Sequence, residues 1–219
     1  DSDTLLILCV SYAGAGQNAE ARAAAVRMVA CDPLAPHSWM ASGFPNWFVG
    51  QPEQGIPDLR RSLDVDSRNF ITHWCLGYNY VLLGRLADAS RHAQVLNDMG
   101  PDVPYTRQLL ALIDGLEGRP QAAIERIAAV DVATLDAHHR FHLAESFIVA
   151  GDRDRGLDLL EQSVVGFYPY PYMAEHCRFL DPVRDSPRFA AVLATAKELA
   201  ESFARREAAI APDARGRHV

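Results

Sequence analysis

Residues 70–103 read FITHWCLGYNYVLLGRLADASRHAQVLNDMGPDV, and the glycine in the middle of this segment keeps a fixed phase along the chain. The glycines at this phase are Gly16, Gly50, Gly84, Gly118 and Gly151, at intervals of 34, 34, 34 and 33 residues. A repeat of this length is typical of stacked helical hairpins. Each glycine is expected to end the first helix of its hairpin with a left-handed turn, which glycine adopts without steric cost.

The rest of residues 70–103 carries a specific pattern around Gly84. Leu76 and Gly77 form a large-small pair, Tyr80 follows as an aromatic, and small and helix-ending residues come later at Ala89 and Pro101. This pattern resembles the tetratricopeptide repeat. The resemblance covers nearly the whole chain and implies five hairpins in an all-α, right-handed superhelix, with units that begin at Ser2, Pro36, Phe70, Pro104 and Ala137.

The chain divides into three parts. Residues 1–165 are predicted to form the five hairpins, with a bend at Pro45 because proline removes a helical hydrogen bond. Residues 166–210 are predicted to form an extended strap over the end of unit five and then a capping helix that begins at Ser186-Pro187. Residues 211–219 are polar and are predicted to be disordered.

The segment from Gly166 to Phe189 also resembles, more loosely, the ending of bacterial tetratricopeptide regions that follow kinase, cyclase or winged-helix domains. This resemblance implies the regulatory part of a larger bacterial signalling protein. The chain begins with Asp1 and not with methionine, so we expect a piece of a longer polypeptide or a processed product.

Composition argues against nucleic-acid and membrane partners and indicates a reducing compartment. The 21 basic and 28 acidic residues give a net charge of −7, which repels phosphate backbones and acidic lipid, so no nucleic-acid partner is expected. No apolar run is long enough to span a bilayer, so no membrane association is expected. The four cysteines form no CxxC pair and lie in apolar helical patterns, which predicts reduced, buried thiols, Cys31 included, in a cytoplasmic protein.

In tetratricopeptide stacks the first helices line a concave groove, and the matching positions here are unusually aromatic. The residues predicted to form a peptide-binding groove are His37, Met40, Phe44, Trp47, Trp74, Tyr78, Tyr105, Gln108, Phe141 and Glu145. Leu6, Val10 and Met40 occupy places where related proteins hold a carboxylate with basic groups, so an apolar peptide or a partner helix is the expected ligand. The resemblance thus implies a protein-interaction module without catalytic activity or cofactor.

Two alternatives stay open at this point. The same aromatic residues could meet a second copy, in a homodimer, or another domain of the protein. The remote alternative is a metal or enzymatic site, because His138 and His142 share a helix face and Glu145 lies one turn further. No phosphate-binding loop or nucleophile motif supports an enzyme.

Overall fold

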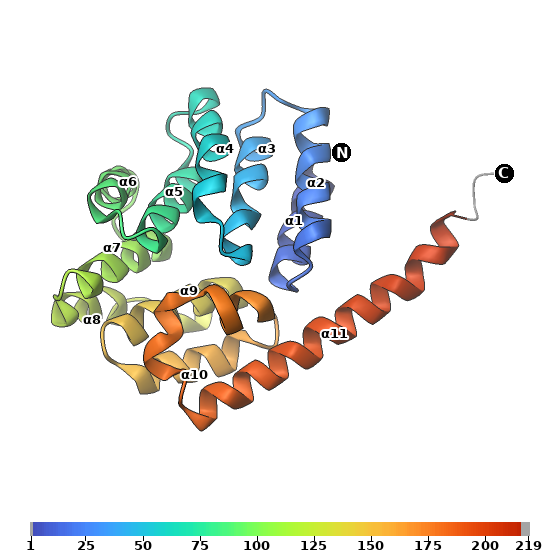
Figure 1. Ribbon diagram of the computed structural model, residues 1–219. Coiled ribbons are helices and arrows are strands. Elements are labelled where there is room, and N and C mark those ends of the chain that lie inside the picture. Colours follow the sequence, from blue (N-terminus) through green and yellow to red (C-terminus); the bar gives the residue numbers. More distant parts are fainter. Residues whose placement is uncertain (1, 216–219) are drawn as a thin grey trace.

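A computed structural model of the protein describes the backbone of residues 2–215 and the side chains of residues 2–209. The elements of its five hairpins are α1 (Ser2–Gly14) and α2 (Asn18–Cys31), α3 (Pro36–Gly43) with η1 (Phe44–Val49) and α4 (Pro52–Val65), α5 (Phe70–Leu82) and α6 (Leu86–Met99), α7 (Pro104–Leu116) and α8 (Pro120–Ala128), and α9 (Ala137–Val149) and α10 (Arg153–Ser163). The hairpins follow one another along a curved stack (Figure 1). The all-α superhelical fold predicted from the 34-residue repeat is confirmed.

The turn inside every hairpin has the predicted left-handed glycine. The five phased glycines have φ values of 74°, 70°, 71°, 76° and 92°, and no other residue of the described chain has a positive φ. In the third unit the amide that follows Gly84 donates to the carbonyl of Tyr80 at 2.8 Å, which closes the turn, and equivalent bonds recur in the other four units. The equally spaced glycines therefore form five turns with the same backbone conformation and the same closing hydrogen bond.

The second hairpin departs from the regular pattern at the predicted place. α3 ends at Gly43, and residues 44–49 continue as a 3-10 helix, so the regular α-helix stops just before Pro45, where a bend was predicted. Its two helices also approach closely, because a Cβ added to Gly55 on α4 would lie 2.4 Å from the carbonyl oxygen of Gly43. Only glycine at position 55 allows this crossing distance.

The segment after α10 differs from the prediction. Between α10 and η4 only residues 167–169 and Cys177 lack regular or turn structure, and the chain forms a π-helical turn η3 (Tyr172–His176) and a 3-10 helix η4 (Arg178–Val183). Pro171 sits at the start of a helical turn, where proline is tolerated because its missing amide would have no partner there. We call residues 166–183 the C-terminal strap.

The C-terminal strap contacts α9 and α10 of unit five and also reaches across the concave side to units one, two and three. The amide of Tyr168 donates to the carbonyl of Gly14 at 2.9 Å. The ring of His176 lies against Gly50, and the guanidinium of Arg178 donates to the carbonyl of Leu82 at 3.3 Å. The strap thereby ties the last hairpin to the turns of the first three.

The last helix, α11 (Pro187–Arg215), begins where Ser186-Pro187 predicted it. It is longer than expected, because residues 211–215 of the predicted disordered tail are helical; residues 216–219 lie outside the described part of the chain. Its first turns bury Phe189 and Val192, and further along Phe203 meets the ring of Tyr12 edge-on at 6.0 Å. α11 therefore runs from the last hairpin back to the first (Figure 1).

Two smaller findings concern the cysteines and membranes. Three cysteines are buried as predicted, but Cys31 is exposed, because it ends α2 and its side chain lies beyond the last packed turn. None of the described helices combines the length and the apolar composition that crossing a bilayer requires.

Candidate functional site

Most of the predicted groove residues fall into two groups with different surroundings. One group, Trp47, Tyr78, Phe141 and Glu145, is completely buried beneath the C-terminal strap. A second group, Met40, Phe44, Trp74 and Tyr105, borders an open pocket. Gln108 is buried between the two groups, and His37 is half-buried at the edge of the first two hairpins, where its Nε2 lies 3.1 Å from the hydroxyl of Ser2.

The first group forms an aromatic cluster that the C-terminal strap completes. The ring of Trp47 packs edge-on against that of Tyr78 at 5.3 Å, and Phe48 meets Tyr172 of the strap at 5.4 Å. Phe141 packs against Phe167 of the strap at 5.2 Å. Here the concave side is filled by the chain itself, so this half of the predicted groove is not open to a peptide.

A buried carboxyl group lies at the centre of this cluster. Oε1 of Glu145 accepts hydrogen bonds from the hydroxyl of Tyr78 at 2.7 Å and from the thiol of Cys177 at 3.0 Å. The hydroxyl of Tyr172 lies 2.6 Å from that of Tyr78 and extends the cluster into the strap. The strap is therefore held by polar contacts as well as by its apolar side chains.

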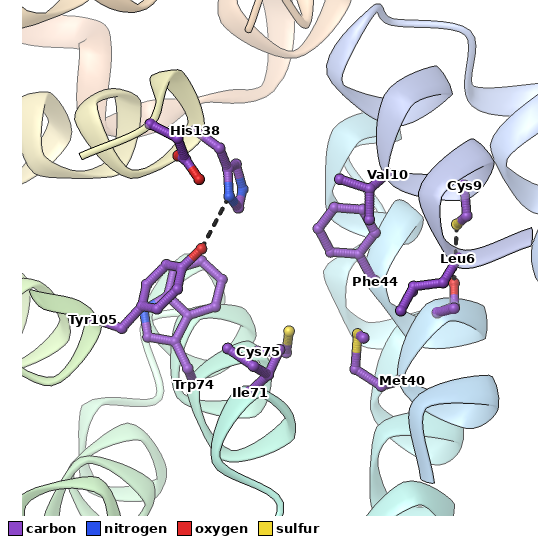
Figure 2. A pocket seen from close by; sticks show the side chains of 12 residues that line it. Leu6, Cys9, Val10, Met40, Phe44, Ile71, Trp74, Cys75, Tyr105 and His138 are labelled. Carbon is purple, nitrogen blue, oxygen red and sulfur yellow. Dashed lines mark hydrogen bonds between the residues drawn. The ribbon is translucent and has the colours of Figure 1, made fainter. Parts of the chain in front are cut away.

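A line of hydrogen bonds leads from Glu145 to the open pocket. Oε2 of Glu145 lies 2.7 Å from Nδ1 of His142, and Nε2 of His142 lies 3.1 Å from Nε2 of His138. Nδ1 of His138 lies 3.1 Å from the hydroxyl of Tyr105, a contact drawn in Figure 2. Two proton arrangements satisfy the whole line. In one, Tyr105 donates to His138, His138 to His142, and His142 to the carboxylate of Glu145. In the other, which carries no charge, the acid of Glu145 donates to His142, His142 to His138, and His138 to Tyr105.

The ionisation of these groups agrees with this neutral arrangement. Burial raises the pKa of Glu145 to about 8, against hydrogen bonds from Cys177 and Tyr78 that favour the carboxylate. Burial lowers the pKa of His142 to about 3, and burial together with the neighbouring His142 lowers the pKa of His138 well below its usual range. At neutral pH the line therefore carries a carboxylic acid and two neutral imidazoles.

This arrangement also bears on the metal alternative at His138, His142 and Glu145. The facing nitrogens of the two histidines bond to each other, and Glu145 bonds to His142. Within the described part of the chain no three His, Cys, Asp or Glu side chains gather in a way that could hold a metal ion. The spacing along the helix does bring His138, His142 and Glu145 together. They form a line of hydrogen bonds and not a set of metal ligands.

The open pocket lies between the first two hairpins and the next three, and it has a volume of about 240 Å³. Figure 2 shows Leu6, Val10, Met40 and Phe44 on one side of it and Ile71, Trp74 and Tyr105 on the other, with His138 at its rim. The indole ring of Trp74 is held in place in the wall of the pocket, because its Nε1 donates a hydrogen bond to Oε1 of Gln108 at 2.8 Å. Apart from Asp136, His138 and the hydroxyl of Tyr105, the lining is apolar or sulfur-containing.

Sequence reasoning missed the strap residues Tyr172 and Cys177 and the pocket residue Asp136. Tyr172 belongs to the aromatic run from Phe167 to Tyr172, and the many aromatic rings in the predicted extended strap were the signal that it would be buried. No comparable signal marks Cys177, whose thiol meets Glu145 only through the fold.

Comparison with known proteins gives likeness in structure alone. No protein-family model and no curated protein matches the chain. Among solved structures, the APC/C hetero-tetramer Cut9-Hcn1 matches with a TM-score of 0.60 and 16% identity, over 90% of this chain and 43% of that chain. The MamA protein matches with a TM-score of 0.48 and 14% identity, over 75% and 91% of the two chains. The P58(IPK) TPR domain matches with a TM-score of 0.44 and 21% identity, over 97% and 68%.

Proposed function

Because this chain has the tetratricopeptide-repeat fold, we propose that it is a non-catalytic protein-interaction module that binds an apolar segment of a partner protein, as a peptide or a helix, in its open pocket. The observation that carries this proposal is the pocket itself. Four successive first helices, α1, α3, α5 and α7, contribute apolar side chains to one concavity. Concave apolar sites with a few placed polar groups are where proteins bind ligands.

The size of the pocket favours one or two side chains of a partner protein as the ligand over a free small molecule. Pockets for drug-sized molecules run from about 300 to 1,000 Å³. The present pocket, at about 240 Å³, is smaller and accommodates one or two apolar side chains. Trp74 and Tyr105 offer rigid aromatic contact area to such an anchor, and the hydroxyl of Tyr105 offers a hydrogen bond to its backbone.

The test uses a charge placed in the pocket. Short random peptides displayed on phage are selected on the wild-type protein, and the selected peptides are then synthesised with a fluorescent label. Ile71, which is 38% exposed at the pocket rim, is changed to arginine, and Val26, which is 65% exposed on α2 away from the pocket, is changed to arginine as the matched control. We expect Ile71→Arg to weaken binding at least about tenfold and Val26→Arg to leave it unchanged. Equal binding to all three proteins would refute the proposal.

Self-association through the pocket remains the second candidate. Sedimentation of the wild-type protein distinguishes it, because a dimer that Ile71→Arg dissociates would place a second copy in the pocket. Intramolecular docking is favoured by one observation, that the aromatic residues beneath the C-terminal strap already meet the chain's own Phe167 and Tyr172. A regulatory role in a larger bacterial signalling protein stays a prediction from the sequence resemblance.

A further inference from the structure

The line of hydrogen bonds from Glu145 has one group that can bind a ligand in the open pocket, the hydroxyl of Tyr105. Glu145 and His142 are fully buried, whereas Tyr105 is half-buried and lines the pocket. His138 lines the pocket too, but its two ring nitrogens are taken up by His142 and Tyr105. Figure 2 shows the ring of His138 and the hydroxyl of Tyr105 facing each other at the pocket. A ligand therefore meets the line at the Tyr105 hydroxyl.

The two proton arrangements of the line differ in what this hydroxyl offers. When Glu145 is a carboxylate, every proton of the line points toward it, and the hydroxyl hydrogen of Tyr105 is bound to Nδ1 of His138. When Glu145 is the acid, every proton points the other way. Nδ1 of His138 then donates to the oxygen of Tyr105, and the hydroxyl hydrogen is free to be donated into the pocket. The proton on Glu145 thus determines whether Tyr105 is a donor to the ligand.

We propose that the pocket recognises a backbone carbonyl of the partner segment through the hydroxyl of Tyr105, and that this contact forms only while Glu145 carries its proton. The inference rests on the proposed function, an apolar segment anchored in the pocket, and adds a carbonyl beside the anchor. A carbonyl oxygen accepts and does not donate, so it bonds to Tyr105 in the acid arrangement alone. A carboxylate is disfavoured as the acceptor, because Asp136 in the same lining is an anion.

Among the described groups that face Glu145, none other changes its charge near neutral pH. Tyr78 of α5 and Tyr172 and Cys177 of the C-terminal strap adjoin it, and burial raises the pKa of each of the three well above its usual value. On its own helix, burial lowers the pKa of His142 to about 3. Glu145, with a pKa raised by burial to about 8, is the group of this cluster that titrates.

The groups around Tyr105 include one that the experiment must separate from Glu145. Burial raises the pKa of Tyr105 and of Cys75 in the same pocket, so both stay neutral. Burial opposes the ionisation of Asp136, but the amide and the ring of His139 outweigh it and lower the pKa of that carboxyl. The ring of His139 lies 3.9 Å from that of Tyr105, and its Nδ1 lies 2.9 Å from Oδ1 of Asp136. Glu145→Gln separates the two, because it leaves His139 in place.

The first measurement needs no ligand. Nitrogen-15 chemical shifts of an imidazole distinguish hydrogen on Nδ1 from hydrogen on Nε2. We expect His138 to carry its hydrogen on Nδ1 at pH 7 and on Nε2 at pH 9.5, and to stay neutral throughout. In Glu145→Gln the glutamine amide donates at every pH, so His138 keeps its hydrogen on Nδ1. A wild-type His138 with the same tautomer at both pH values would overturn the proposal.

The second measurement uses the labelled peptides whose binding Ile71→Arg weakens, capped at both ends. From pH 7 to pH 9.5 we expect their affinity for the wild type to fall about threefold to tenfold, the effect of losing one hydrogen bond. Glu145→Gln keeps the affinity of pH 7, and Tyr105→Phe binds with the weaker affinity at both pH values. Tyr80→Phe is the matched control, because its hydroxyl bonds to Arg60 outside the pocket, and it behaves as the wild type. Circular dichroism verifies that each variant is folded at both pH values.

The outcomes separate this inference from the proposed function. An equal fall in affinity in Glu145→Gln would assign the pH dependence to another group, such as His139, and would overturn the inference. Peptides that require Ile71 but bind equally at both pH values would also overturn it and would leave the proposed function intact. If no selected peptide requires Ile71, the proposed function fails, and the inference fails with it.

Discussion

Replacement of Glu145 by glutamine tests the charge state of the buried line of hydrogen bonds. Protonated Glu145 donates from Oε2 to His142 and accepts at Oε1 from Tyr78 and Cys177. The amide of glutamine has the same shape, donates at the same place and accepts at the other. Glu145→Gln should therefore keep every contact at neutral pH, provided that the native group is the acid.

The magnitude follows from the pKa of Glu145, which burial raises from 4.5 to about 8. Between these values the folded protein holds a proton that the unfolded chain has released, so the free energy of unfolding decreases as the pH rises. The decrease is about 1.4 kcal/mol per pH unit, and from pH 5 to pH 8 it amounts to about 3 to 4 kcal/mol. The stabilisation is fully present below pH 4.5 and is lost as the pH passes through about 8.

Urea unfolding of both proteins at several pH values measures this difference. We expect the glutamine variant to gain about 3 to 4 kcal/mol relative to the wild type between pH 5 and pH 8. His142, whose pKa is lowered to about 3, destabilises the fold as the pH falls from 6.5, and this effect is common to both proteins. A difference that changes by less than about 1 kcal/mol over the range would refute a protonated Glu145. It would indicate instead that Glu145 is a carboxylate that accepts a hydrogen bond from neutral His142.

Three further predictions test the fold around this site. Gly55→Ala should destabilise the protein by about 2 kcal/mol or more in urea unfolding, because its Cβ would press on the carbonyl of Gly43, whereas Gly118→Ala, at a left-handed turn with open space, should cost only about 1 kcal/mol. Phe179→Ala should cost about 3 to 5 kcal/mol, since the C-terminal strap is core; a melting temperature unchanged from wild type would show it to be a loose linker. Ellman's reagent should titrate one thiol of the native protein, Cys31, and all four after unfolding; a second native thiol would contradict the burial of the others.

The repeat architecture could be predicted from the sequence because its determinants are local. A left-handed turn at Gly84 needs only a glycine at that position, and the equal spacing of the other four sets the length of each hairpin. The interruption at Pro45 and the start of α11 at Pro187 also follow from the chemistry of one residue each. The position of a residue in the repeat also predicts whether it lies on the side of the first helix that faces the concavity.

What fills the concavity depended on contacts between residues far apart in the sequence. Tyr78 and Tyr172 are 94 residues apart, and no local pattern brings their hydroxyl groups together. The strap folds back because the concave side can bury its aromatic rings, and this divides the predicted groove into a covered part and an open pocket. The sequence alone thus determined the stack of hairpins, through turn geometry and periodicity. Only the tertiary structure decided which part of its inner surface stays free, because burial depends on how the whole chain closes on itself.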